Sequence, residues 1–301
     1  MTLHAIVAAL GGDLYAAGMR ANVPAPGHSA RDRSVSLLLC GDRLVLHSFG
    51  DADWRAVRDH LRARGLIDGT GRIAAGAGGG RRSAAVRPER AARVATARRL
   101  WAEAGAIGAA ALSRRYIAAR AIGLEPAAVP SLRHHPAAPV SAYGTGGATR
   151  PALVAAIRRP DGTLTAVELV YLSPNGRPDD RLRLPRKTVG VVPPGSAVRL
   201  AAGAPVLLVG EGVMTVLSAS ERFGLPAWAL MSAHNLAAWT PPSVVRRVVI
   251  AADRGAPGEA AARRLLDRLG DRGVDRIVVL PPGGAEDWNA AALAERRKEG
   301  G

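Results

Sequence analysis

Three carboxylates in the C-terminal third of the sequence have the type and spacing for metal chemistry. Glu211 follows the apolar run at residues 206–210, and Asp253 follows a second apolar run at residues 248–252. Asp287 stands in a later glycine-containing turn. Carboxylate oxygens are the hard ligands that Mg²⁺ and Mn²⁺ take in proteins. We therefore predict a divalent-metal site built from Glu211, Asp253 and Asp287.

The surrounding segments predict the elements that position these side chains. Both apolar runs contain β-branched residues and stop abruptly at a carboxylate, as buried parallel strands do. Acidic residues at the carboxyl ends of such strands face the crevice where open α/β sheets bind ligands. Helices and strands are expected to alternate between and after them, with helices at 213–223 and 258–269 and strands at 227–231 and 277–280. The pattern predicts an α/β unit with a mainly parallel sheet.

This arrangement resembles the Toprim domain, the metal-binding module of bacterial-type primases and topoisomerases. Toprim sequences place a glutamate after the first strand and an Asp-x-Asp after a later one, which Glu211 and Asp253 match. A late Asp-Trp-Asn turn occurs in primase-like members of mobile elements, and residues 287–289 read Asp-Trp-Asn. Two positions depart from the pattern, because the second aspartate of the pair is Gly255 and a frequent second acidic residue is Met214.

The resemblance implies a role for each carboxylate. Glu211 is expected to be the general acid/base or a metal-organising carboxylate, Asp253 to hold Mg²⁺, and Asp287 to assist directly or through water. Taken singly, Asp253 and Asp287 also fit helix caps or turn formers, because each precedes a helix-like segment. For Asp287 alone, a helix cap is the favoured interpretation. The order of all three carboxylates along the chain favours a Toprim metal site.

Composition indicates a polyanion partner. The 301 residues carry 41 Lys and Arg against 25 Asp and Glu, a formal net charge of +16. Nearly all of this positive charge is arginine, which high-GC coding bias explains, but such bias does not explain the excess of base over acid. The single Cys40 excludes an internal disulfide. No secretory pattern and no membrane-spanning apolar run occur, so we expect a cytoplasmic protein without membrane association.

Residues 1–66 resemble the CHC-type zinc-binding domain at the front of bacterial primases. Most ligands of that family are missing, since Ala25 replaces the first cysteine, His28 remains, and Ser48 to Asp51 stand where a later Cys-x-x-Cys belongs. We therefore expect no zinc. A cluster of His28, Cys40 and His47 stays open as an alternative, although isolated His and Cys in an apolar β context are more often structural.

Between the two ends we expect a Gly/Arg-rich linker at 67–90 and a helical plus β region at 91–203. A helix containing Tyr116 and Arg120 resembles the Tyr-Leu-x-x-Arg-Gly helix of phage- and plasmid-type primases. Two apolar runs around Pro-Asp-Gly at 160–162 predict a β-hairpin. The candidate phosphate contacts are basic side chains of this region: Arg120, Arg183, Lys187 and Arg199.

The sequence thus predicts an α/β protein in which a small α+β unit and an α+β primase-core-like region precede a Toprim domain at 204–298. The resemblance implies Mg²⁺-dependent primer synthesis from nucleoside triphosphates on single-stranded DNA, in phage, plasmid or mobile-element replication. A catalytically reduced nucleic-acid-binding accessory is the alternative, and a nuclease is a third. The chain lacks a P-loop, so any helicase must be a separate partner.

Overall fold

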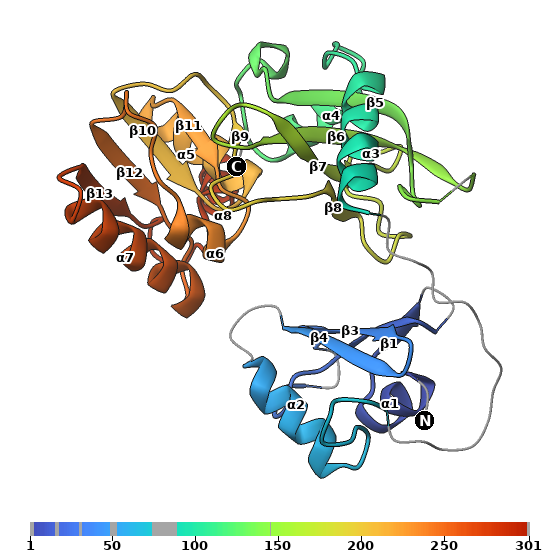
Figure 1. Cartoon of the computed structure of the whole chain (residues 1–301). Helices are drawn as coiled ribbons and strands as arrows, with labels where there is room; N and C mark the ends of the chain where they lie inside the picture. Colours follow the sequence, from blue (N-terminus) through green and yellow to red (C-terminus); the bar gives the residue numbers. More distant parts are fainter. Residues whose placement is uncertain are drawn as a thin grey trace. The chain divides into compact units, whose positions relative to one another are not determined.

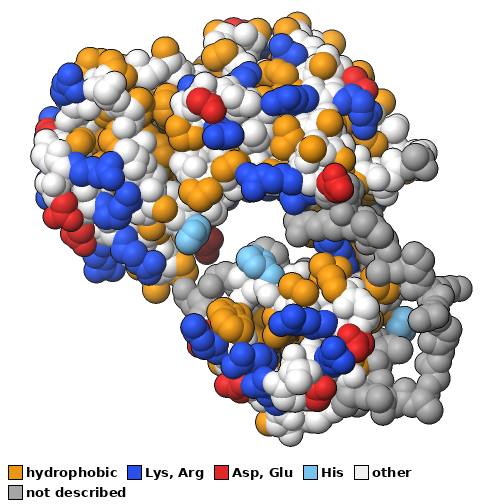
Figure 2. All heavy atoms as spheres, viewed as in Figure 1, with side chains coloured by type: hydrophobic (Ala, Val, Ile, Leu, Met, Phe, Trp, Pro, Cys, Tyr) orange, Lys and Arg blue, Asp and Glu red, His pale blue; other side chains and the backbone are white. Residues whose placement is uncertain are grey.

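The computed structural model describes residues 3–15, 18–29, 32–48, 53–73, 89–144 and 146–299. It divides into two compact units, Met1–Arg87 and Pro88–Gly301, which are described separately. Lys and Arg side chains are spread widely over the face of the molecule drawn in Figure 2. No helix within the described ranges is both long and apolar enough to pass through a lipid bilayer.

The first unit is an antiparallel sheet with two helices (Figure 1). Its elements in chain order are α1 (Leu3–Leu10), β1 (Asp13–Tyr15), β2 (Arg20–Val23), β3 (Val35–Cys40), β4 (Arg43–Ser48) and α2 (Trp54–Ala63). The side chain of Asp53 caps α2 by accepting a hydrogen bond from the Arg55 N–H at 2.9 Å. Residues 67–73, part of the predicted linker, pack with this unit, because Ile67 and Ile73 are buried in its core. The remaining linker residues 74–88 lie outside the described residues.

The second unit begins with two helices and a four-stranded antiparallel sheet. These elements are α3 (Arg90–Glu103), α4 (Leu112–Ala119), the 3-10 turn Pro126–Ala128, β5 (Leu132–Pro139), β6 (Thr149–Arg158), β7 (Leu164–Tyr171) and β8 (Arg186–Gly190). The strands follow one another in order, so the predicted hairpin around residues 160–162 is confirmed as β6 and β7.

Strand β7 is buried on both faces, and its alternating side chains enter two different cores. Val167 and Leu169 pack with α3, in a cluster that includes Leu100. Ala166 and Val170 point the other way, into a cluster shared with the C-terminal sheet. Because side chains alternate along a strand, this one sheet separates the α3 side from the C-terminal side.

The C-terminal part is a five-stranded sheet in the order β13-β12-β10-β11-β9. Its elements are β9 (Val198–Arg199), β10 (Val206–Gly210), α5 (Val213–Phe223), β11 (Ala227–Ala229), α6 (Ala233–Ala238), β12 (Arg247–Ala251), α7 (Ala256–Gly270), β13 (Asp275–Val279) and α8 (Trp288–Glu299). All neighbouring strands are parallel except β9, which is antiparallel to β11. Leu208 on β10 packs with α5, whereas Leu207 and Val209 pack with α6 and α7 on the other face. This confirms the predicted α/β unit with its mainly parallel sheet.

Candidate active site

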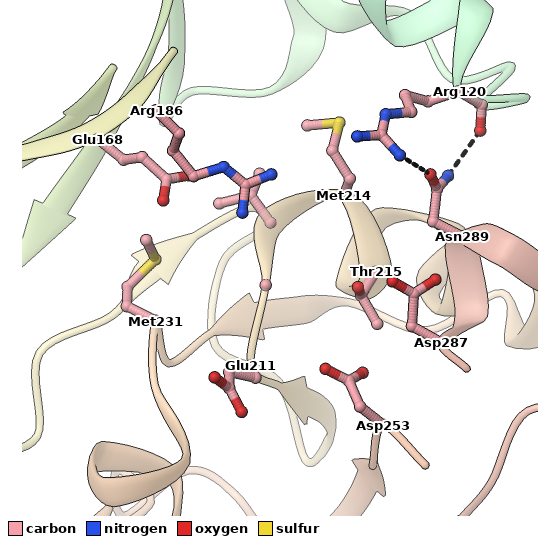
Figure 3. Close-up of a pocket in the computed structure, with 12 residues that line it drawn as sticks. Arg120, Glu168, Arg186, Glu211, Met214, Thr215, Met231, Asp253, Asp287 and Asn289 are labelled. Atoms are coloured by element: carbon pink, nitrogen blue, oxygen red, sulfur yellow. Dashed lines mark hydrogen bonds between the residues drawn. The ribbon is translucent and has the colours of Figure 1, made fainter. Parts of the chain in front are cut away.

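The predicted carboxylates lie at the carboxyl ends of adjacent parallel strands. Gly210 pairs with Ala251 at the last register position of β10 and β12, so Glu211 and Asp253 follow these strands at the same sheet edge. Asp287 reaches the same pocket from the turn before α8 (Figure 3). The pocket has a volume of about 200 Å³. Its charged lining residues are Arg120, Glu168, Arg186, Glu211, Asp253 and Asp287.

Two carboxylates in this pocket, Asp253 and Glu211, are poorly compensated by protein groups. Burial, followed by the nearby charges of Glu211 and Asp287, raises the pKa of Asp253 to about 7. Its Oδ1 atom is buried and has no hydrogen-bond partner among the described residues. Burial also raises the pKa of Glu211, and the backbone N–H of Ala233 acts in the opposite direction. Buried carboxylates without cationic partners are the environment that a bound cation stabilises.

The residues present fit Mg²⁺ in its usual mode of binding. Within the described part of the chain, no three acidic, His or Cys side chains converge closely enough to ligate one ion directly. Mg²⁺ keeps several waters in most protein sites and takes one or two carboxylates. The unpartnered Asp253 oxygen and the neighbouring Glu211 carboxylate supply that number of ligands.

Close backbone packing sets the position of Asp253. Gly258 lies in the first turn of α7, where a Cβ atom would stand 2.7 Å from the Asp253 carbonyl oxygen. Arg254 joins the end of β12 to the turn that carries Asp287, because its N–H donates to the Glu286 carbonyl at 2.8 Å and its guanidinium donates to the Pro281 carbonyl at 2.7 Å. Glycine at 258 and arginine at 254 thus hold the two aspartates near each other.

Gly255, which stands in place of the second aspartate, has a backbone that disfavours side chains. Its φ is 107° and its ψ is 156°, in a region occupied almost only by glycine. A Cβ atom there would meet nothing closer than Pro257 Cδ at 4.0 Å, so space is available and the restriction is conformational. The departure from Asp-x-Asp is therefore accompanied by a different backbone conformation at the start of α7.

Each residue of the Asp-Trp-Asn turn makes contacts that fix α8. Asp287 Oδ1 accepts a hydrogen bond from the Ala290 N–H at 2.6 Å, so the predicted cap is present in a residue that also lines the pocket. Trp288 is buried, with its ring edge-to-face against Phe223 at 5.2 Å between centroids. The buried Asn289 donates to the Arg120 carbonyl at 2.6 Å and to Ser218 Oγ at 2.9 Å.

Of the four predicted phosphate-contacting residues, Arg120 alone lines the pocket. Lys187 donates to the Val140 carbonyl and lies over the Tyr171 ring, and burial lowers its pKa. Arg199 donates to the Arg159 and Pro160 carbonyls at 2.7 Å each. Arg183 is exposed on the segment before β8.

Two residues that line the pocket, Arg186 and Glu168, were not predicted from the sequence. Arg186 pairs with Val170, whereas the adjacent Lys187 pairs with Leu169, so the two cations lie on opposite faces of the sheet. Side chains alternate between the two faces along a strand, so a strand at residues 186–190 places Arg186 and Lys187 on opposite faces. Burial raises the pKa of Glu168, and the nearby charge of Arg186 partly offsets this. A charged residue within an otherwise apolar strand was the available signal for Glu168.

The N-terminal unit shows no metal-ligand cluster within its described residues. His28 Nδ1 lies 3.1 Å from the Asp32 carboxylate. Cys40 pairs with Arg43, and His47 pairs with Ser36, so Cys40 and His47 stand at opposite ends of the β3–β4 ladder. Four residues along a strand span roughly 13 Å, too far for one ion. The predicted replacement of the later cysteine pair at 49–51 lies outside the described residues.

Two family models match the second unit. A domain of unknown function, DUF7146, matches residues 91–200, and the Toprim domain matches residues 206–297. The search of curated proteins found no match.

Solved primase structures are similar at low identity. The Aquifex aeolicus primase, with its zinc-binding and RNA polymerase domains, is 14% identical over 99% of this chain and 82% of its own, with a TM-score of 0.43. A DnaG primase catalytic domain bound to ssDNA is 15% identical over 62% of this chain and 69% of its own, with a TM-score of 0.42. The bacteriophage T7 primase fragment is 16% identical, with a TM-score of 0.37. That match covers 50% of this chain, which spans 60% of the T7 fragment.

The matched Toprim segment coincides with the alternating strands and helices from β10 to α8, and it contains Glu211, Asp253 and Asp287. Residues 206–297 of this chain are a Toprim domain.

Proposed function

We propose that this protein is a primase-like nucleotidyltransferase that makes RNA primers on single-stranded DNA with Mg²⁺ or Mn²⁺. The observation that carries the proposal is the pocket at the carboxyl end of the Toprim sheet. It combines Glu211, Asp253 and Asp287 with two arginines, Arg120 and Arg186. Carboxylates for a metal beside guanidinium groups for phosphates form the pairing that phosphoryl transfer uses.

In this mechanism the acidic and the basic side chains of the pocket have different tasks. Asp253 and Glu211 would hold the metal, which would neutralise the charge that develops on the reacting α-phosphate. Glu211 also accepts the proton of the attacking 3′-hydroxyl. Arg120 and Arg186 bind phosphate oxygens of the incoming nucleoside triphosphate, and both line the pocket. Asp287 acts through water, because its Oδ1 already caps α8.

The proposed setting is the replication of a phage, plasmid or mobile element in the cytoplasm. The arginine-rich chain binds the single-stranded template, and its net charge of +16 favours that association. A separate helicase supplies any unwinding. These assignments rest on the Toprim domain and the composition of the chain.

A catalytically reduced accessory protein is the second candidate, and Gly255 favours it. The position of the second Asp-x-Asp carboxylate holds a residue without a side chain, in a conformation that disfavours one. An accessory of this kind binds nucleic acid through the same basic surface without extending a primer.

Primer synthesis on single-stranded DNA separates the two candidates. The assay uses labelled nucleoside triphosphates, Mg²⁺ or Mn²⁺ and low salt, and it compares the wild type with Glu211→Gln and Asp253→Asn. Asp267→Asn serves as a matched control, because Asp267 is an exposed acid on α7 that does not line the pocket. We expect product from the wild type and the control and none from the pocket variants. Salt-sensitive DNA binding without product from any form would favour the accessory.

A further inference from the structure

A second groove lies on the opposite side of the β5–β8 sheet from the carboxylate pocket. One wall is a face of α3 from Arg90 to Arg98, and the other comes from the start of β7 and the segments around it. Its volume is about 750 Å³. Thr165 lines this groove, on the strand that presents Glu168 to the carboxylate pocket. The two sites are therefore separated by one sheet.

Three arginines and no acidic residue line the groove. The Arg90 side chain is exposed at the start of α3. Arg98 donates through Nε to the Leu164 carbonyl at 3.2 Å, which leaves its terminal amino groups for a ligand. Arg159 lies 3.5 Å from Asp161, but both side chains are about half exposed, at 49% and 52%. Such an exposed ion pair contributes little and exchanges easily for another anion.

The floor of the groove contains a buried polar atom without a partner. Thr165 is 6% exposed, and its Oγ1 has no hydrogen-bond partner among the described residues. Its own carbonyl is already used, because it accepts from the Val191 N–H at 2.9 Å. A buried hydroxyl left unpaired costs free energy that a ligand accepting its hydrogen bond would recover.

Apart from Thr163, the rest of the lining is apolar, and it contains no aromatic ring. The apolar lining residues are Ala91, Val94, Ala95, Val191 and Pro193. Apolar surface between guanidinium groups suits a backbone in which sugars join successive phosphates, and phosphate contacts carry no sequence information. The chain's own segment 74–88 is a poor occupant, because its three charged residues are all arginines.

We propose that this groove binds the phosphate backbone of single-stranded nucleic acid, outside the Toprim pocket. Arg90, Arg98 and Arg159 contact successive phosphates, and the Thr165 hydroxyl donates to a phosphate oxygen. Through this groove the protein would bind single-stranded nucleic acid independently of catalysis.

The test measures binding of labelled oligothymidylate by fluorescence anisotropy across a salt series. The variant carries Arg90→Gln, Arg98→Gln and Arg159→Gln, which remove three charges while keeping an unbranched polar side chain at each position. Each single-strand phosphate contact contributes about 0.7 to the slope of log K against log salt, so we expect the slope to fall by about 2. Affinity at 0.1 M salt should fall on the order of tenfold to a hundredfold.

A control variant removes the same charge from another surface. Arg263, Arg264 and Arg297 are exposed on α7 and α8 and do not line the groove. Their replacement by Gln should change affinity by about threefold or less, because salt screens distant charges. Equal losses in the two triple variants would overturn the proposal. Thermal unfolding of both variants checks that the fold is retained.

Thr165→Val gives an independent arm, because valine keeps the shape and removes the hydroxyl. We expect weaker binding together with unchanged or higher thermal stability, since an unpaired buried group is lost. Wild-type affinity in this variant would overturn the role of the hydroxyl. A polyglutamate competitor that displaces oligothymidylate as well as unlabelled oligothymidylate does would overturn the assignment to nucleic acid. The Asp267→Asn variant, which changes an exposed residue of α7 outside both sites, should bind as the wild type does.

Discussion

Arg120 and Asn289, 169 residues apart, exchange two hydrogen bonds. Arg120 Nη1 donates to Asn289 Oδ1 at 3.0 Å, and Asn289 Nδ2 donates to the Arg120 carbonyl at 2.6 Å (Figure 3). The exchange joins the end of α4 to the first turn of α8. Asn289 thereby orients Arg120, which lines the pocket, and Asn289 lies only two residues after Asp287. One contact thus positions both Arg120 and Asp287.

Loss of this contact should destabilise the second unit. Asn289→Ala removes three hydrogen bonds and takes partners from the half-buried Arg120 and the buried Ser218. We expect a loss of about 2–4 kcal/mol in unfolding free energy, measured by urea denaturation. A double-mutant cycle with Arg120→Ala should give a coupling of about 1 kcal/mol or more. Additive losses would show that the two side chains act separately.

An aspartate at position 255 should not restore a Toprim metal site. Gly255→Asp and Gly255→Ala both force a side chain into a backbone with φ of 107°, so each should cost about 1–3 kcal/mol. Thermal unfolding measures the cost, and primer synthesis measures the activity. Equal losses in the two variants would identify backbone strain as the cause. A gain in activity with aspartate alone would contradict this account.

At Ala121 the reverse substitution, from alanine to glycine, tests backbone strain. In the resembling primase helix the residue after the arginine is glycine, and here Ala121 has φ of 58°. Ala121→Gly should therefore stabilise the protein by about 0.5–1 kcal/mol, because alanine in this left-handed conformation is strained. Ala118→Gly within α4 is the matched control and should destabilise by a similar amount. Destabilisation by both Ala121→Gly and Ala118→Gly would contradict strain at Ala121.

The raised pKa of Asp253 predicts that the metal-free protein loses stability as pH rises. The ordinary pKa is 3.8 and the folded value is about 7, so between these values the native state binds more protons than the unfolded state. The unfolding free energy should fall through this window, by roughly 1–3 kcal/mol from this group. Asp253→Asn should remove that part of the pH dependence, as measured by denaturation in EDTA from pH 5 to pH 8.

Added Mg²⁺ should stabilise the protein most at pH values at which the Asp253 carboxylate is ionised. We expect a larger increase in melting temperature at pH 8 than at pH 6, because protons compete with the ion for Asp253. The increase should be absent in Asp253→Asn. The Asp267→Asn control should keep it, since that side chain does not line the pocket. A pH-independent shift in the wild type would place the ion elsewhere.

The strands that carry Glu211 and Asp253 could be predicted from the sequence because their signals are local. An apolar β-branched run ending at a carboxylate needs no distant contact to be recognised, and β10 and β12 lie where those runs do. The helix at 213–223 was predictable for the same reason. Gly224 ends it in a left-handed conformation with φ of 62°.

The members of the pocket that come from the other sheet could not be predicted in this way. Glu168 and Arg186 reach the carboxylates only because the β5–β8 sheet packs against α5, a contact set by tertiary structure. Lys187 and Arg199 were attractive by charge, yet their guanidinium or ammonium groups bind backbone carbonyls. Charge identifies a basic segment, whereas the strand register decides which of its members face a site.

The shared core between the two sheets decides how the protein can be cut for study. Leu153 and Val170 pack in one cluster with Val213 and Leu217. A fragment starting at residue 204 would expose that apolar face to solvent and should aggregate or unfold. The smallest self-contained expression fragment with the Toprim domain starts near residue 89, and domain exchange between related proteins should move residues 89–299 as one piece.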